Sequence, residues 1–271
     1  MFPIKDNVPT DRFPFVTVAL ILANVVVYLL AIRHGGTILG GPGPAVETKY
    51  SLIPYTLTHY GTHCAQFGEQ TLSGTQSLGV FCSGQTLPDG TIAHVGAQGT
   101  IPTWETIFTS MFMHASILHI GGNMLFLWIF GNNVEDSMGP VKFLVFYIGG
   151  GLAALALQIA VGSNSKVPTL GASGAIAAVL GGYIVLYPRA RVLTLVFIIF
   201  LVTVVELPAL VMLGAWFALQ AVFGAANLTN PTGGGGGVAY FAHIGGFVFG
   251  LLVIRLLATR RKEIPPRLPV Y

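Results

Sequence analysis

Residues 15–32 read FVTVALILANVVVYLLAI, and this stretch decides the class of fold. It holds no charged residue and has about the length that a helix needs to cross the hydrocarbon core of a bilayer. A secretory signal peptide is the competing interpretation, but the run is long and no A-x-A cleavage pattern precedes Arg33. We therefore expect a transmembrane helix here.

The composition of the whole chain points the same way. Of its 271 residues, 53% are hydrophobic and 8% are charged, and the mean hydropathy is +0.74. Soluble domains carry roughly a quarter charged residues, so this chain lacks the charge to cover a water-facing surface of its size. These numbers exclude a soluble enzyme, a disordered chain and a collagen-like chain, and a net charge of +3 is too small to indicate nucleic-acid binding. They predict an all-α, multi-pass membrane protein.

Further apolar runs follow the first one. A long, largely polar loop, residues 34–113, separates it from the rest and becomes apolar only at its end. We predict six transmembrane helices within residues 14–258, a short segment of residues 1–13 before them and a basic tail of residues 259–271 after them. The five later spans are expected within residues 119–130, 141–161, 171–187, 210–225 and 239–257.

The distribution of Lys and Arg predicts the orientation. With six spans and the N-terminus inside, ten of the basic residues lie inside and only Arg33, Lys49 and Lys166 lie outside, which is the bias that the positive-inside rule requires. This count holds only if the apolar stretch Val192–Val205 does not cross the membrane, and we expect it at the interface or within the bundle. We expect both termini to be cytoplasmic and the protein to lie in a bacterial cell membrane.

Both cysteines, Cys64 and Cys82, lie in the polar loop. They could form a disulfide if this loop faces an oxidising compartment, or they could be two unpaired thiols, and the sequence leaves both open. His63 and His94 are nearby, but the spacing matches no zinc pattern, so no metal is expected.

A serine flanked by small residues opens one of the predicted spans, in the sequence GASG at residues 171–174. At a helix N-terminus, Ser173 would have an exposed hydroxyl beside backbone N–H groups that can stabilise an oxyanion. Taken alone the motif is weak, because Gly and Ser are common where helices pack in membranes.

His243 strengthens the chemical interpretation, because a serine in a membrane needs a base to become a nucleophile. Small residues recur at every fourth position beside each of the two: Gly174, Ala178 and Gly182 in one span, and Ala242, Gly246 and Gly250 in the other. Such seams let two helix backbones approach closely. If Val192–Val205 does not cross, Ser173 and His243 lie at the same outer face.

The pair is predicted to act as a dyad, because the only acid near a late span, Glu206, would lie at the opposite, inner end. His119 and Asn123 are four residues apart, hence on one helical face, and both side chains can donate to an oxyanion. A polar pair that merely packs two helices is the alternative for them. His114 would point elsewhere, and we expect it to fix the loop that enters the helix.

Taken together, these segments resemble the rhomboid intramembrane serine proteases. The resemblance is carried by HASILHIGGN (114–123), GNNVEDSMG (131–139), GASG (171–174) and AHIGGFVFG (242–250). It implies a six-helix core, a Ser173–His243 dyad and an oxyanion site made by His119, Asn123 and the backbone N–H of Ser173. It also implies a cavity open to the outer side, a partly embedded first loop, a cap at residues 226–237, and cleavage of transmembrane substrates through an acyl-enzyme.

The sequence departs from the family pattern at three positions. Glu105 follows Trp104 where many members have Arg, Ser137 replaces the Arg of a Glu-x-Arg pattern, and Ala177 stands where some members have a Tyr that supports the histidine ring. These departures concern the packing of the site and leave the dyad intact.

Two functions fit the sequence. In the first, the chain is a serine endopeptidase that acts on single-pass transmembrane proteins in the bilayer, without cofactor, metal, nucleotide or nucleic acid. The glycine run at residues 233–237 lacks the Lys-Ser/Thr of a phosphate-binding loop and is interpreted as a lid. In the second, the chain is a non-catalytic binding, chaperone-like or transport protein with the same cavity. A transporter has no reason to place Ser173 and His243 at matching depths, so we favour the protease.

Overall fold

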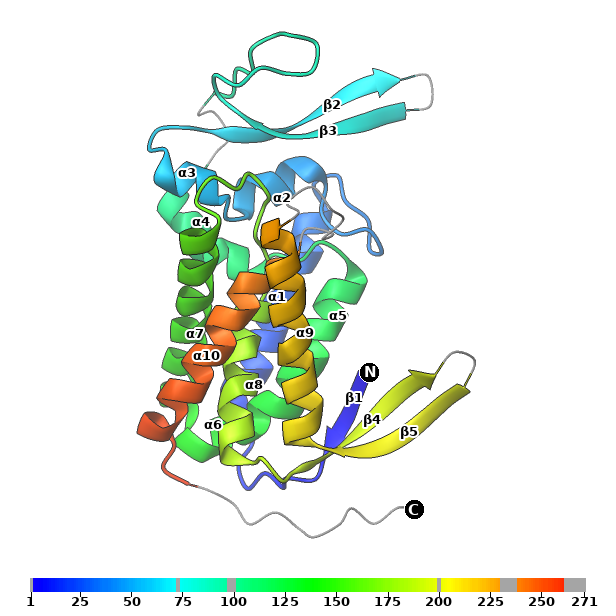
Figure 1. The fold of residues 1–271 in the computed structure, drawn as a ribbon, viewed down its shortest axis with the longest axis vertical. Coiled ribbons are helices and arrows are strands. Elements are labelled where there is room, and N and C mark those ends of the chain that lie inside the picture. Colours follow the sequence, from blue (N-terminus) through cyan, green and yellow to red (C-terminus); the bar gives the residue numbers. More distant parts are fainter. Residues whose placement is uncertain (1, 72–73, 97–100, 199–200, 230–237, 261–271) are drawn as a thin grey trace.

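The structure, a computed structural model, describes residues 2–71, 74–96, 101–198, 201–229 and 238–260. Its long helices stand side by side in one bundle, and a small β-sheet lies at each end of that bundle (Figure 1). The elements, in chain order, are β1 (Phe2–Asp6), α1 (Phe15–Ile32), α2 (Pro44–Tyr50), α3 (Pro54–Thr58), β2 (Cys64–Thr71), β3 (Gly74–Cys82), α4 (Thr103–Thr109), η1 (Ser110–Phe112), α5 (Ile117–Phe126), η2 (Leu127–Gly131), α6 (Asn132–Met138), α7 (Pro140–Val161), α8 (Ser173–Leu186), β4 (Arg191–Ile198), β5 (Leu201–Pro208), α9 (Ala209–Thr229) and α10 (Tyr240–Leu257).

Within the described residues, four helices are long and apolar enough to cross a membrane, namely α1, α7, α9 and α10. A fifth candidate is a pair of helical segments, residues 103–112 and 117–138, that are bent by 76° at the break between them. The helix α8 is also apolar but has only 14 residues. The predicted helical membrane bundle is therefore confirmed, whereas the count of six spans stays a prediction.

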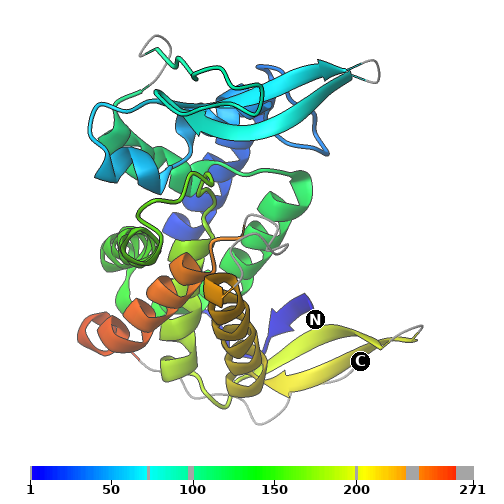
Figure 2. The same cartoon turned by 45° about the horizontal axis from the view of Figure 1, so that its top comes forward.

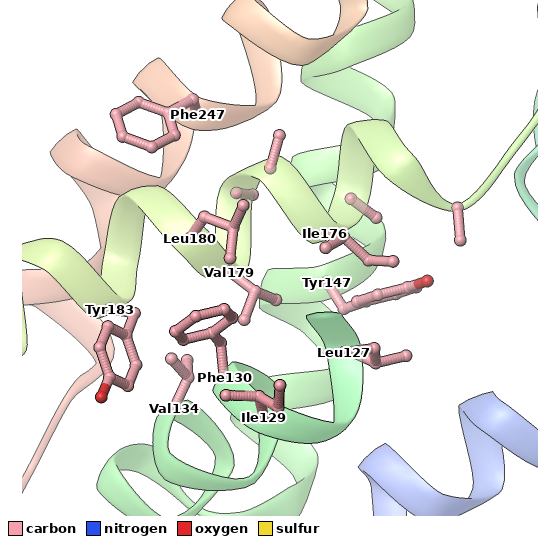
Figure 3. Close-up of a cluster of buried hydrophobic side chains, with 14 of the residues drawn as sticks. Leu127, Ile129, Phe130, Val134, Tyr147, Ile176, Val179, Leu180, Tyr183 and Phe247 are labelled. Atoms are coloured by element: carbon pink, nitrogen blue, oxygen red, sulfur yellow. The ribbon is translucent and has the colours of Figure 1, made fainter. Parts of the chain in front are cut away.

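The core of the bundle is built around α8. Nearly every residue of this helix is buried, and it packs against both α7 and α10. From its inner half, Val179, Leu180 and Tyr183 meet Phe130 and other apolar side chains of the α5–α6 region (Figure 3). A helix of 14 residues is about 21 Å long, shorter than the about 30 Å of a hydrocarbon core. A helix of this length is too short to cross the hydrocarbon core by itself.

At the end of the bundle that the charge distribution predicts to be outer, part of the stretch predicted as a polar loop is ordered. It contains α2, α3 and the antiparallel hairpin β2–β3, which crosses over this end of the bundle (Figure 2). Cys64 and Cys82 face each other at the open end of the hairpin and are joined by a disulfide. Of the two alternatives that the sequence left open, the structure has the disulfide.

At the opposite end, which the charge distribution predicts to be inner, the described residues of the apolar stretch Val192–Val205 form strands and not a helix. They lie in the antiparallel hairpin β4–β5, to which β1 adds a third strand in the order β1-β4-β5. The hairpin starts and finishes at the same end of the bundle, since Arg191 pairs with Pro208. The chain therefore enters α9 from the end at which it left α8, as the charge distribution predicted. The sheets themselves were not predicted, because only helices were expected.

The N-terminal segment is tied to this inner end by a buried carboxylate. The Oδ2 atom of Asp6 accepts hydrogen bonds from the Tyr183 hydroxyl and from Asn133 Nδ2, the latter at 2.7 Å. Burial raises the pKa of Asp6 to about 6, although the hydrogen bond from Tyr183 works in the opposite direction. Nearby, Glu135 accepts hydrogen bonds from the backbone N–H groups of Val16 and Thr17 and so caps the start of α1.

Candidate active site

Ser173 is the first residue of α8, and the turn before it requires a glycine. Gly171 has φ +119°, which side chains rarely allow, and its N–H donates to the carbonyl of Ser110 at 2.8 Å. A Cβ atom at Gly171 would lie 2.9 Å from His119 Nε2 and 3.6 Å from Ser173 Oγ. The glycine therefore lets the His119 ring approach this turn closely, beside the serine hydroxyl.

The helices α8 and α10 make the closest helix contact in which these residues take part. A Cβ atom at Gly246 would lie 2.0 Å from the carbonyl oxygen of Gly174, and one at Gly250 would lie 2.0 Å from that of Ala178. Neither position tolerates a side chain unless the backbones separate. The predicted seams of small residues do lie against each other, and they bring the starts of the two parallel helices together (Figure 1).

This approach brings Ser173 and His243 into hydrogen-bond contact. His243 Nε2 lies 2.8 Å from Ser173 Oγ, and His243 Nδ1 lies 2.8 Å from Oε1 of Gln220 in α9. An amide oxygen can only accept, so the Gln220 contact requires the proton on Nδ1 and leaves the lone pair of Nε2 to accept from the serine hydroxyl. The contacts therefore select the tautomer in which the imidazole can act as a base.

The histidine ring is supported from α9. The Trp216 ring lies 5.7 Å from that of His243 between centroids, tilted by 37°. On the α8 side, Ala177 is fully buried, and a Cβ at Gly246 would meet its Cβ at 3.3 Å. Trp216 thus supplies a ring contact to His243 in a chain that has Ala177 where some members of the family have Tyr.

His119 and Asn123 lie on the facing helix, α5. The Nδ1 atom of His119 accepts a long contact of 3.5 Å from the N–H of Ala115, which leaves the proton on Nε2, the atom beside the Gly171 turn. Within the described part of the chain, the buried Nδ2 of Asn123 has no hydrogen-bond partner. Two side-chain donors are therefore available near the serine, one of them unsatisfied, and both border the same cavity.

His114 occupies a different place, as its position in the sequence suggested. It is buried, its Nδ1 lies 3.2 Å from the carbonyl of Phe112, and its Nε2 accepts from the N–H of Ala172 at 3.5 Å. It joins the turn before α5 to the turn before α8, and it does not line the cavity around Ser173.

The cavity has a volume of about 570 Å³. Ser173, His243, His119 and Asn123 line it together with apolar side chains and with Glu47 of α2. Burial raises the pKa of the Glu47 carboxyl. The site thus brings a serine hydroxyl, two imidazoles and a side-chain amide together in one largely apolar chamber that is large enough for peptide side chains.

Four polar or aromatic residues of this region were missed by the sequence analysis. Gln220 and Trp216 contact His243, and Gln158 of α7 accepts a hydrogen bond from the N–H of Ala242 at the start of α10. A signal was present for the two glutamines, because each is a polar residue inside an apolar run and such residues are costly in a membrane. Glu47 gave no such signal, since it lies in a stretch rich in polar residues.

Comparisons with known proteins identify the family. Residues 102–260 match the family described as the Rhomboid domain. Rhomboid protein 1, mitochondrial, of Saccharomyces cerevisiae is 32% identical over 151 residues, which are 54% of this chain and 40% of that protein. RHOMBOID-like protein 12, mitochondrial, of Arabidopsis thaliana is 29% identical over 52% of this chain and 43% of its own length. The mouse presenilin-associated rhomboid-like protein, mitochondrial, is 29% identical over 54% and 36%.

These relatives contradict one prediction, and the chain matches only part of each of them. All three are named as mitochondrial proteins, so the prediction of a bacterial cell membrane with cytoplasmic termini is wrong. Charge asymmetry indicates which ends of a bundle share a side, but it does not say which membrane holds the bundle. The matched segment spans less than half of each of these relatives.

The family match covers more than half of the chain and contains Ser173, His243, His119 and Asn123. The same region carries the membrane helices α7, α9 and α10 and the short central helix α8. This chain therefore belongs to the rhomboid family.

Proposed function

We propose that this protein is a serine endopeptidase that cuts transmembrane protein substrates near the outer face of the membrane through a Ser173–His243 dyad. The observation that carries the proposal is the 2.8 Å contact between Ser173 Oγ and His243 Nε2. A hydroxyl held against an imidazole of the correct tautomer is the arrangement that makes serine a nucleophile.

In the proposed reaction, Ser173 Oγ attacks the carbonyl carbon of the scissile peptide bond while His243 Nε2 takes the hydroxyl proton. The carbonyl oxygen becomes an oxyanion and accepts hydrogen bonds from His119, Asn123 and the backbone N–H of Ser173. The C–N bond then breaks as His243 returns the proton to the leaving amine. A water, deprotonated by His243, attacks the acyl-enzyme and releases the second product with the serine restored.

Gln220 and Trp216 are proposed as positioning residues in this reaction. The amide oxygen of Gln220 holds the Nδ1 proton of His243, and it stabilises the imidazolium as a dipole rather than as a charge. Trp216 limits rotation of the ring. The side-chain N–H donor of Asn123 has no hydrogen-bond partner among the residues that the structure describes. A polar residue that only packs two helices would donate to the neighbouring helix, so the free donor favours an oxyanion site.

The substrate is proposed to be a single-pass transmembrane protein whose helix unwinds near its outer end. A peptide bond in a regular helix is shielded by its own backbone, so cleavage requires a segment that opens easily, as Gly or Pro residues allow. The names of the relatives favour a mitochondrial membrane as the location.

The test is cleavage of a model substrate in proteoliposomes. The substrate is a single transmembrane helix with a Gly-Pro pair near its outer end, and a matched helix with Ala-Leu at these positions is the control. We expect wild-type protein to cut the first helix near the Gly-Pro pair, with no cleavage by the Ser173→Ala or His243→Ala variant. Equal cleavage by Ser173→Ala would exclude the proposed nucleophile, and absence of cleavage with any unwinding helix would favour the non-catalytic alternative.

A further inference from the structure

The inner sheet β1-β4-β5 has one covered face and one uncovered face. Val192 and Thr194 of β4 are fully buried on the covered face, and the Thr194 hydroxyl contacts Met212 of α9. Side chains alternate between faces along a strand, so the neighbouring residues Leu193 and Leu195 lie on the other side. On that side Phe2, Lys5, Val202 and Val204 are exposed, and Leu193 and Leu195 are half-buried.

The uncovered face is apolar over most of its length. Phe2, Leu195 and Val204 are paired across the three strands and form one row, and Val202 lies two residues earlier in β5, toward the tip of the hairpin. The exposed fractions of Phe2, Val204 and Val202 are 51%, 48% and 57%. Water would make such a row of exposed apolar side chains costly, at about 25 cal/mol for each Å².

Charge is confined to the base of this sheet, where it joins the bundle. The next row on the same face is Lys5, Leu193 and Glu206, and Glu206 pairs with Arg191 at 4.0 Å. Arg189, just before β4, is exposed. The face therefore changes from charged to apolar with distance from the base, and basic groups that can meet lipid phosphates lie at the charged end.

The position of the sheet relative to α9 decides what covers this face. The strand β5 ends at Pro208 and α9 begins at Ala209, so the sheet is attached directly to the first turn of a membrane-spanning helix. Leu210 and Val211 in that turn are 56% and 54% exposed. Their apolar surface is in lipid if α9 spans, and the hairpin extends sideways from this foot of the bundle rather than beneath it (Figures 1 and 2).

We propose that the uncovered face of β1-β4-β5 lies on the lipid of the inner leaflet, with its apolar rows in the acyl region and its charged base at the headgroups. The open edge of β5 sets the depth, because unpaired backbone groups are too costly in the hydrocarbon core and are tolerated only near the polar interface. The sheet is thus a second membrane contact that does not cross the bilayer, and it fixes the height and tilt of α9.

The test is the accessibility of a nitroxide label in liposomes. Single cysteines replace Val202 or Val204, while Cys64 and Cys82 are held in their disulfide and do not react. Collisions with oxygen, which concentrates in lipid, are compared with collisions with a water-soluble nickel chelate. Leu252→Cys on the exposed side of α10 is the lipid control, and Asp89→Cys in an exposed turn at the outer end is the water control.

We expect both β5 labels to match Leu252, with nickel collisions several-fold lower than at Asp89, and a label at Lys5→Cys to fall between the two controls. Nickel accessibility at Val202 and Val204 equal to that at Asp89 would overturn the proposal, because the face would then be in water. Labels shielded from both reagents and immobilised would also overturn it, because a second copy or another protein would then cover the face. Because Val202 and Val204 lie on the same face, the test can still be read from one of them if the other variant fails to fold.

Discussion

Nδ1 of His243 lies 2.8 Å from Oε1 of Gln220, on the side of the imidazole ring away from Ser173. A carboxylate in this position would hold the ring and also stabilise its charged form. The amide holds the ring and selects the tautomer, but it contributes only a dipole. His243 thus has a hydrogen-bond partner on each ring nitrogen, as in a triad, but the third residue, Gln220, carries no charge.

Replacing Gln220 tests this role. We expect Gln220→Ala to lower kcat by about tenfold to hundredfold with little change in KM, because the ring loses its orientation while the cavity stays in place. Gln220→Glu should restore much of the rate and move the acidic limb of the pH–rate profile to higher pH, because a carboxylate stabilises the imidazolium. The neighbouring lipid-exposed Leu219→Ala is the control. A pH profile that is the same in all variants would show that Gln220 has only a structural role.

The contact between α8 and α10 gives the second prediction. Gly246→Ala places a Cβ against the Gly174 carbonyl, so the helices must separate and the bond between Ser173 and His243 must lengthen. We expect a loss of stability on the order of 1–3 kcal/mol together with loss of serine reactivity. Gly214→Ala in α9 is the matched control, since its added Cβ meets nothing within 4 Å and its stability should be unchanged or raised by up to about 1 kcal/mol. Equal thermal unfolding and equal reactivity of both variants would contradict the close approach.

The buried carboxyl of Asp6 should make the stability of the folded protein depend on pH. Its pKa in the folded protein, about 6, lies above the ordinary value of 3.8, so the folded state holds the proton more tightly than the unfolded state does. The free energy of unfolding therefore falls as the pH rises from about 4 to about 6, by up to about 3 kcal/mol, and stays lower at higher pH. Asp6→Asn keeps an acceptor for Tyr183 and removes the titration.

The measurement for Asp6 is thermal unfolding in detergent from pH 4 to pH 8. The stability of Asp6→Asn relative to wild type should rise over this range and level off above about pH 6, the region in which the wild-type carboxylate becomes charged. Glu105→Gln, at a partly exposed position in α4, controls for the effect of net charge on the micelle. If the stability difference between Asp6→Asn and wild type did not vary with pH, Asp6 would not be a buried carboxyl with a raised pKa.

Much of this architecture could be predicted because a membrane restricts the choices. Uncharged runs such as Phe15–Ile32 become helices since no other open segment satisfies its backbone in lipid. The small residues around Gly174 and Gly246 predicted the close helix pair, because nothing larger fits between two backbones. The count of Lys and Arg predicted that Val192–Val205 does not cross.

The sheets and the support of the histidine could not be predicted in the same way. Val192–Val205 is as apolar as a helix, and its strand structure depends on pairing with Phe2–Asp6, which is remote in the sequence. The contacts of Gln220 and Trp216 depend on how α9 rotates against α10, and a uniformly apolar helix gives little periodic signal for its rotation. The disulfide depended on hairpin register, which places Cys64 opposite Cys82.

An activated Ser173 reacts with a fluorophosphonate, so the rate at which this reagent labels the protein measures that activation directly. The wild type, Ser173→Ala, His243→Ala and the matched serine variant Ser163→Ala are purified in detergent, and the labelled peptide is identified by mass spectrometry. We predict labelling of the wild type and Ser163→Ala on the peptide that contains Ser173, and loss of labelling in both Ser173→Ala and His243→Ala. A folded wild type that stays unlabelled, or a Ser173→Ala variant that labels at the wild-type rate, would contradict the account.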